Sequence, residues 1–167
     1  MRAFDVKTYS VVILGIGCTL FRDQGFGVHL VHELDRRFEF GERVLLIDGG
    51  TIGVHLVGTL VGSEQVIAID TVRQGGAPGT IYRFEEQQIM ARLNKADHLL
   101  QETFIEALAH CRMLDNGPRA VMLGIEHGND HDLICGLTPV LAAKVDEMIG
   151  RVLKELDGLE AAYKRRV

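Results

Sequence analysis

Three short runs of aliphatic and β-branched residues, each closed by glycine or aspartate, constrain the fold of this chain more than any other feature. They are SVVILGIG at 10–17, RVLLID at 43–48 and QVIAID at 65–70. Continuous apolar runs of this length are typical of strands buried on both faces of a parallel sheet. Segments with helical periodicity separate the runs, so the sequence predicts a mostly parallel sheet with helices on both faces.

The rest of the chain extends this pattern. TIYRF at 80–84 begins only about nine residues after Asp70, which is too short for a parallel crossover, so we expect an antiparallel edge strand. Pro139 is expected to begin one long helix that ends in the basic tail KRRV. The predicted fold is an α/β three-layer sandwich with a twisted, mostly parallel five-stranded sheet. The other expected elements are helices at 26–38, 51–62, 85–93 and 98–111, and a last strand at 119–126.

Composition excludes several functional classes. The 167 residues predict one domain spanning 1–167, and a formal charge of -5 argues against nucleic acid or an anionic membrane as partner. The N-terminus lacks the apolar stretch of a secretory signal, and no apolar run is long enough to span a bilayer. The three cysteines suggest neither a disulfide framework nor a zinc cage. We therefore expect a cytoplasmic protein.

The candidate functional residues follow the predicted strands, since ligands of open α/β sheets bind beyond the carboxyl ends of the strands. Asp70 ends the third run, where its carboxylate would face that crevice or cap the next turn. His98 follows a good N-cap, Asp97, and the helix dipole there favours the neutral, metal-binding imidazole. The polar loop around His131 is a candidate for substrate contact.

Two familiar motifs are incomplete. GIGCTL begins like the dinucleotide fingerprint but has Leu20 in place of the third glycine, and Asp48 comes later than the acidic residue of that motif. His32 and Glu33 begin a zinc-protease motif whose second histidine is replaced by Arg36. The zinc-protease motif is excluded, and a nucleotide-binding module remains an alternative.

Six segments in series resemble the hydrogenase maturation protease family. The resemblance implies a phosphorylase-like α/β fold and an endopeptidase that removes the C-terminal extension of a nickel-loaded hydrogenase large-subunit precursor. It further implies a monomer that recognises nickel presented by the substrate, with another divalent metal as a possible ligand of the free protein. The segments are GIGCTLFRDQGFGVHLVHEL, DGGTIGVHLVG, VIAIDTV, GAPGTIYRF, NKADH and GLTP.

The resemblance places three metal ligands at Gln24, Asp70 and His98. The family has a carboxylate where this chain has Gln24, and a carboxamide brings a dipole instead of a charge, so affinity for free metal should be lower. Ligation through the Gln24 amide oxygen, or through neighbouring Asp23, would preserve activity. Otherwise the chain is a non-catalytic chaperone that binds the precursor.

The remaining candidates concern the substrate. Asp48, Gly49, Gly50 and Thr51 are expected to shape the cleft for the C-terminal segment, although a plain tight turn explains each glycine equally well. Cys18 stands where the family usually has asparagine, and it is either a soft ligand near nickel or an inert cysteine. No nucleophile is assigned, because no serine or cysteine has a convincing base partner.

Overall fold

The computed structural model describes residues 9–50, 56–92, 99–128 and 133–167. Its main sheet has the order β3-β1-β4-β6-β5. β1, β3, β4 and β6 are parallel, and β5 runs antiparallel to β6 at the edge. The predicted five-stranded sheet and its antiparallel edge strand are therefore confirmed. The strands are β1 (Val11–Gly15), β3 (Val44–Asp48), β4 (Gln65–Val72), β5 (Ile81–Glu85) and β6 (Arg119–Glu126).

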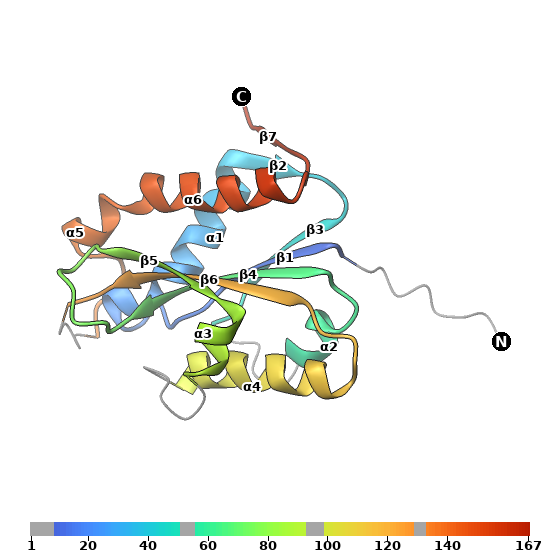
Figure 1. The fold of residues 1–167 in the computed structure, drawn as a ribbon. Coiled ribbons are helices and arrows are strands. Elements are labelled where there is room, and N and C mark those ends of the chain that lie inside the picture. The colour runs from blue at the N-terminus through green and yellow to red at the C-terminus, as the bar shows by residue number, and fades with distance from the viewer. Residues whose placement is uncertain (1–8, 51–55, 93–98, 129–132) are drawn as a thin grey trace.

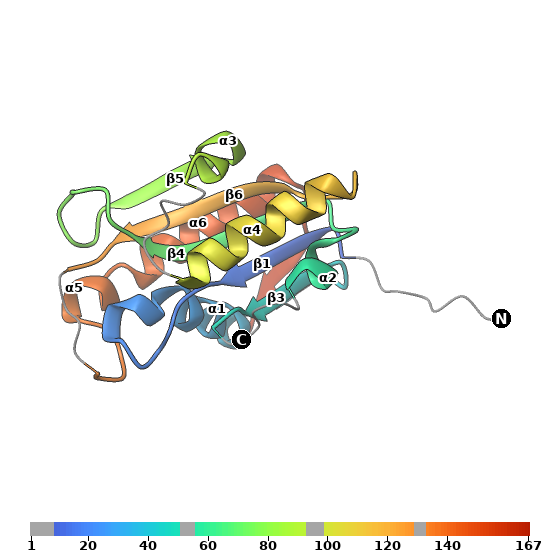
Figure 2. The same ribbon diagram turned by 90° about the horizontal axis from the view of Figure 1, so that it is seen from below.

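Helices cover both faces of the sheet (Figure 1). Val66, Ala68 and Val72 of β4 pack into one apolar cluster with α2 (Leu56–Leu60), α3 (Glu86–Met90) and α4 (Leu99–Met113). Ile67 and Ile69 belong to a second cluster with α1 (Phe26–Arg37), α5 (Pro139–Ala142) and α6 (Val145–Gly158). Figure 2 shows the α2, α3 and α4 layer in front of the sheet. Two clusters on opposite faces make the three-layer sandwich.

The prediction of one long C-terminal helix was wrong. The amide of Lys144 donates to the carbonyl of Leu141, a three-residue step that separates α5 from α6. α6 ends where the amides of Leu159 and Ala161 both donate to the carbonyl of Leu156. Glu160 has a φ of 52°, which turns the chain back. The basic tail is consequently not helical.

Instead, the tail forms β7 (Tyr163–Arg165), which pairs antiparallel with β2 (Phe38–Phe40). The Tyr163 ring lies 6.1 Å from that of Phe38 and 6.4 Å from that of Phe40, between centroids. The earlier expectation that Phe38 belongs to the preceding helix is thus also corrected, because α1 ends at Arg37. Burial of these aromatic rings outweighs the tendency of the basic tail to extend a helix.

The topology creates a switch point between β1 and β4. From β1 the chain moves outward to β3 and then returns to the other side of β1 to form β4. At such a point the connections after neighbouring strands leave toward opposite faces, and a crevice opens beyond the carboxyl ends of the strands. The loop after β1 contains the short 3-10 helix η1 (Arg22–Gly25), which lies against β4.

Candidate functional site

Asp70 lies near the carboxyl end of β4, at the switch point. Its side chain is completely buried. Oδ1 accepts a hydrogen bond of 2.7 Å from the amide of Thr71, and Oδ2 accepts one of 2.9 Å from Nε2 of Gln101. Both donors fix the carboxylate plane, and a carboxylate is a ligand for divalent metals. Thr71 belongs to β4 itself, so this contact lies within the strand, two residues before its end.

Gln101 was not recognised as a site residue from the sequence. It is fully buried on α4, and its Nε2 also lies 3.3 Å from the carbonyl oxygen of Thr71. A signal was present, because Gln101 precedes Phe104, Leu108 and Cys111 at helical spacing on the core-facing side of α4. A polar side chain on an apolar face needs a partner, and here the partner is Asp70.

Gln24 lies in η1, and its side chain is half-buried. The backbone carbonyl oxygen of Gln24 accepts a hydrogen bond of 3.2 Å from the backbone amide of Cys18. The backbone amide of Gln24 donates one of 2.9 Å to the carbonyl oxygen of Phe21. Gly17 has a φ of 133°, and a Cβ on it would lie 1.9 Å from the Gln24 carbonyl oxygen. Glycine at 17 is therefore required for the turn that places Gln24 beyond β1.

Asp23 has a structural role that differs from the one considered for it. Its carboxylate is buried and accepts bonds of 2.7 Å from the Thr138 amide and 2.8 Å from the Thr138 Oγ1. Thr138 is also the N-cap of α5. Both Asp23 oxygens are engaged by this residue, so Asp23 joins the first loop to the segment before α5.

Asp48 and the two glycines after it form a tight turn at the end of β3. The Gly50 amide donates to Asp48 Oδ1 over 3.0 Å, and the Gly49 amide donates to the Gly15 carbonyl over 2.8 Å. Asp48 Oδ2 lies 3.0 Å from Nε2 of His32, in an exposed pair. The turn borders the loop after β1, since a Cβ on Gly50 would come within 2.8 Å of the Gly17 carbonyl oxygen.

Glu126 ends β6 and orders the glycine-rich loop after β4. Its buried carboxylate accepts bonds from the amides of Gln74 and Gly75 at 2.9–3.1 Å. Burial raises the pKa of Tyr82 above its ordinary value, and a hydrogen bond with Glu126 raises it further. Glu126 thus holds a loop that borders the crevice.

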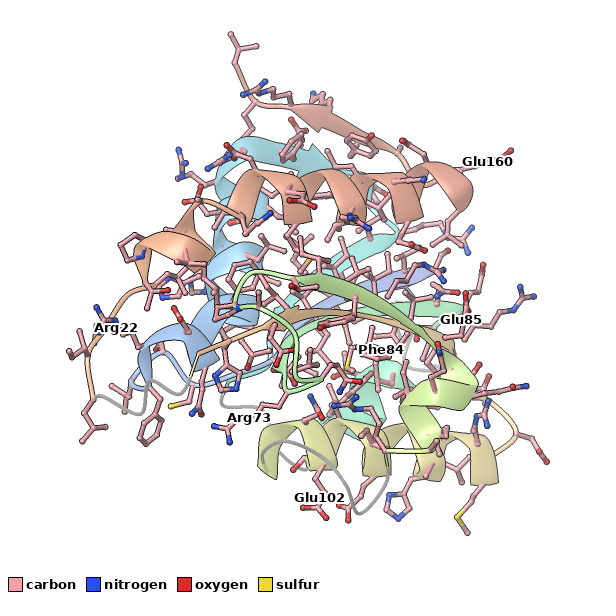
Figure 3. The ribbon with its side chains drawn as sticks, turned by 60° about the vertical axis from the view of Figure 1, so that its left-hand side comes forward. Arg22, Arg73, Phe84, Glu85, Glu102 and Glu160 are labelled. Atoms are coloured by element: carbon pink, nitrogen blue, oxygen red, sulfur yellow. The ribbon has the colours of Figure 1, made fainter. Side chains whose placement is uncertain are left out.

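The structure brings three of the proposed site segments to one edge. The ends of β1, β3 and β4 carry Cys18, Gln24, Asp48, Gly49, Gly50 and Asp70, and Figure 3 shows Arg22 and Arg73 at this end, opposite Glu85 and Glu160. Thr51, His98 and His131 lie outside the described residues. Within the described residues, no three His, Cys, Asp or Glu side chains are grouped to hold a metal. Asp70 offers oriented carboxylate oxygens, and η1, which contains Gln24, lies against β4. This donor set fits an ion that brings other ligands with it.

A cavity of about 540 Å³ lies at the opposite edge of the sheet. It is lined by the starts of the strands, including Val11, Val44, Gln65 and Arg119, and by the segment before β7. In α/β sheets of this kind, ligands bind at the carboxyl edge, so the cavity is not assigned to the same site. No helix among the described residues is long and apolar enough to cross a membrane.

Comparisons with known proteins agree with this architecture. A family model described as hydrogenase maturation protease matches residues 28–155. The hydrogenase expression/formation protein HupD of Thiocapsa roseopersicina is 32% identical over 159 residues, covering 94% of this chain and 72% of that protein. The hydrogenase 2 maturation protease of Escherichia coli is 27% identical over 160 residues, covering 94% and 98%. The solved structure of the hydrogenase maturating endopeptidase HybD from E. coli has a TM-score of 0.87, with 25% identity and coverage of 93% and 97%.

Proposed function

Because the chain belongs to the hydrogenase maturation protease family, we propose that it is an endopeptidase that removes the C-terminal extension from a nickel-loaded hydrogenase large-subunit precursor. The observation that carries this proposal is the buried Asp70 carboxylate, oriented by Gln101 at the switch point between β1 and β4. Thr71 and Gln101 supply the hydrogen bonds that a buried carboxylate needs, and a carboxylate held in this way at the ligand-binding edge supports a role in binding there.

Nickel enters the reaction with the substrate and is recognised by Asp70, Gln24 and His98. Nickel bound by the precursor supplies Lewis-acid chemistry that polarises the scissile carbonyl or activates water. Asp70 orients the metal-bearing segment through its fixed oxygens, and Gln24 contributes an amide oxygen without adding charge. The neutral Gln24 suits a metal whose charge is already balanced by ligands of the precursor.

Cys111 and Ser63 are not favoured as nucleophiles. Burial raises the pKa of the Cys111 thiol, and its Sγ faces the Val57 carbonyl oxygen at 3.8 Å. The Ser63 hydroxyl donates to the Leu60 carbonyl over 2.7 Å. A thiol kept protonated by burial is a poor nucleophile, so hydrolysis by water is the expected route.

Incubation of the purified protein with a cognate nickel-loaded precursor tests the proposal. We expect the mass of the large subunit to fall by a C-terminal peptide. Asp70→Asn and His98→Ala should each lower the cleavage rate by more than about 100-fold, as expected for loss of a metal contact. Asp115→Asn, at an exposed turn after α4 with a φ of 52°, is the matched control and should cleave normally. Failure of the wild-type protein to cleave any cognate precursor contradicts the proposed activity.

A precursor-binding chaperone is the second candidate, and Gln24 is the feature that favours it. A chaperone binds the nickel-loaded precursor and leaves its mass unchanged, whereas a protease shortens it. A nucleotide-binding module predicts a third result, which is a thermal shift with nucleotides and none with divalent metals. These three outcomes distinguish the candidates in one set of assays.

A further inference from the structure

Apolar side chains are exposed on two loops at the carboxyl edge of the sheet. Leu20 and Phe21 belong to the loop after β1 and are 58% and 37% exposed. Leu133 and Ile134 precede α5 and are 74% and 46% exposed. We call these four residues the apolar rim. Exposure of several large apolar side chains to water is unfavourable in free energy. A group of them next to a candidate site therefore indicates a surface that binds another molecule.

The two halves of the rim are joined by buried and backbone contacts. The Arg22 amide donates to the Ile134 carbonyl over 3.0 Å, directly after Phe21 in the chain. Asp23, one residue further, accepts two bonds from Thr138 through its buried carboxylate. The two halves of the rim therefore belong to loops that are bonded to each other, although they lie more than a hundred residues apart in the sequence.

The backbone conformation of Arg22 is a second feature of this arrangement. Its φ of 42° lies in the left-handed region, where a residue with a Cβ is strained. The Arg22–Ile134 bond and the Asp23–Thr138 bonds hold this strained turn in place. Strain of this kind is found where a loop must present its side chains in one geometry.

We propose that the apolar rim docks an apolar stretch of the precursor's C-terminal extension; this inference rests on the proposed function. Leu20 and Phe21 precede Gln24 by four and three residues, so at most about 15 Å separate their Cα atoms from that of Gln24. Four to five residues of extended peptide span about that distance. A peptide whose scissile bond lies near Gln24 and Asp70 thus reaches the rim with its next few side chains.

The size of the rim favours a peptide over a second copy of this chain. Four side chains provide a few hundred Å² at most, roughly half or less of the ~800 Å² that each partner contributes to a stable interface. The extension also distinguishes the precursor from the product. A docking surface for the extension binds the precursor and no longer holds the large subunit after cleavage.

The test measures the affinity of the nickel-loaded precursor for the protein in an Asp70→Asn background, which prevents cleavage during the measurement. We expect Leu20→Ser/Leu133→Ser to weaken binding by at least about 10-fold. Leu114→Ser is the matched control, since Leu114 is 61% exposed in the turn after α4. Its affinity for the precursor should change less than twofold.

The same measurement with the mature large subunit, which lacks the extension, separates the possible contacts. The double variant should then bind as the Asp70→Asn parent does, because the partner of the rim is gone. Equal weakening for precursor and mature subunit would place the rim against the body of the large subunit and overturn the proposal. The proposal would also be overturned if the double variant bound the precursor as tightly as Leu114→Ser does. A change from dimer to monomer caused by the double substitution, measured by sedimentation, would overturn it as well.

Cleavage by the wild-type protein is scored separately. If the wild type does not cut the precursor but binds it through the rim, the protease proposal fails and the docking proposal stands. If it cuts the precursor and the rim variants bind normally, the docking proposal alone fails.

Discussion

At the scale of single residues, the site combines one buried charge with one neutral amide. Asp70 is oriented by Thr71 and Gln101, and Gln24 is positioned by the backbone turn at Gly17. A carboxylate at position 24 would add a full negative charge beside the same crevice. If the proposed function holds, we expect the charge at this position to set how strongly the protein attracts a metal that arrives without ligands.

Gln24→Glu should tighten binding of Ni²⁺ or Zn²⁺ to the free protein by about tenfold or more, because a carboxylate replaces an amide dipole. Isothermal titration calorimetry with each metal checks this. Gln87→Glu, on the exposed side of α3, makes the same charge change away from the site and should leave metal affinity unaltered. Unchanged affinity in Gln24→Glu would place residue 24 outside the metal shell.

Gln101→Leu should destabilise the fold by about 1–3 kcal/mol, because the buried Asp70 Oδ2 loses its bond from Nε2. Urea unfolding at pH 7 measures the loss. The same variant should lower the cleavage rate by about 10–100-fold, as expected for a residue that orients a ligand. Gln101→Glu is not a suitable control, since it places two carboxylates together. Wild-type stability and activity in Gln101→Leu would show that the contact has no orienting role.

At the scale of elements, one ion-pair network ties α1 to α6. Arg37 Nε donates to Glu33 Oε2 over 2.7 Å within α1, and Arg37 Nη1 donates to Asp146 Oδ1 over 2.5 Å at the start of α6. Hydrogen bonds from Arg36 and then Arg37 outweigh burial and lower the pKa of Glu33 from 4.5 to about 2. A carboxyl group with a depressed pKa stabilises the fold above its unfolded pKa and loses that contribution in acid.

Glu33→Gln should lower the free energy of unfolding by about 0.5–1 kcal/mol at pH 7, a discounted value because the network is partly exposed. The difference from wild type should close as pH falls from about 4.5 toward 2, where Glu33 itself becomes protonated. Urea unfolding across this range measures it. Glu106→Gln, on an exposed position of α4, should stay within 0.5 kcal/mol of wild type throughout. A difference independent of pH would rule out charge as its cause.

At the scale of the whole molecule, the candidate site and the ribbon that anchors the C-terminus lie at opposite edges of the sheet. The carboxyl edge carries the candidate site and the apolar rim. At the other edge, the C-terminal strand β7 returns to β2, and three aromatic rings from these two strands pack together. This ribbon ties the end of the chain to the connection between α1 and β3, which stabilises the α1–α6 layer far from the site.

Tyr163→Ala should lower the free energy of unfolding by about 1–3 kcal/mol, since it removes ring contacts with Phe38 and Phe40 and the 2.9 Å bond to Asp157. Precursor cleavage should be unaffected at temperatures where the variant is folded. Lys164→Ala removes only an exposed pair with Glu39 and should stay within about 0.5 kcal/mol. Similar losses in both variants would mean that the aromatic cluster does not anchor the tail.

The sequence by itself determined the sheet, since apolar runs of strand length are typical of buried strands and nine residues are too few for a parallel crossover. It also placed Asp70 near the end of the third of these strands, and the resemblance to the family placed Gln24 in the loop after the first. Only the tertiary structure showed that α6 stops at Gly158 and that the tail pairs with β2, because the partners of Tyr163 lie more than a hundred residues away in the chain. The same reason applies to Asp23 against Thr138 and to the apolar rim, and Gln101 meets Asp70 across 31 residues. Local periodicity predicts which face of an element is buried, but the partner that a buried polar group meets there is decided by packing between distant segments.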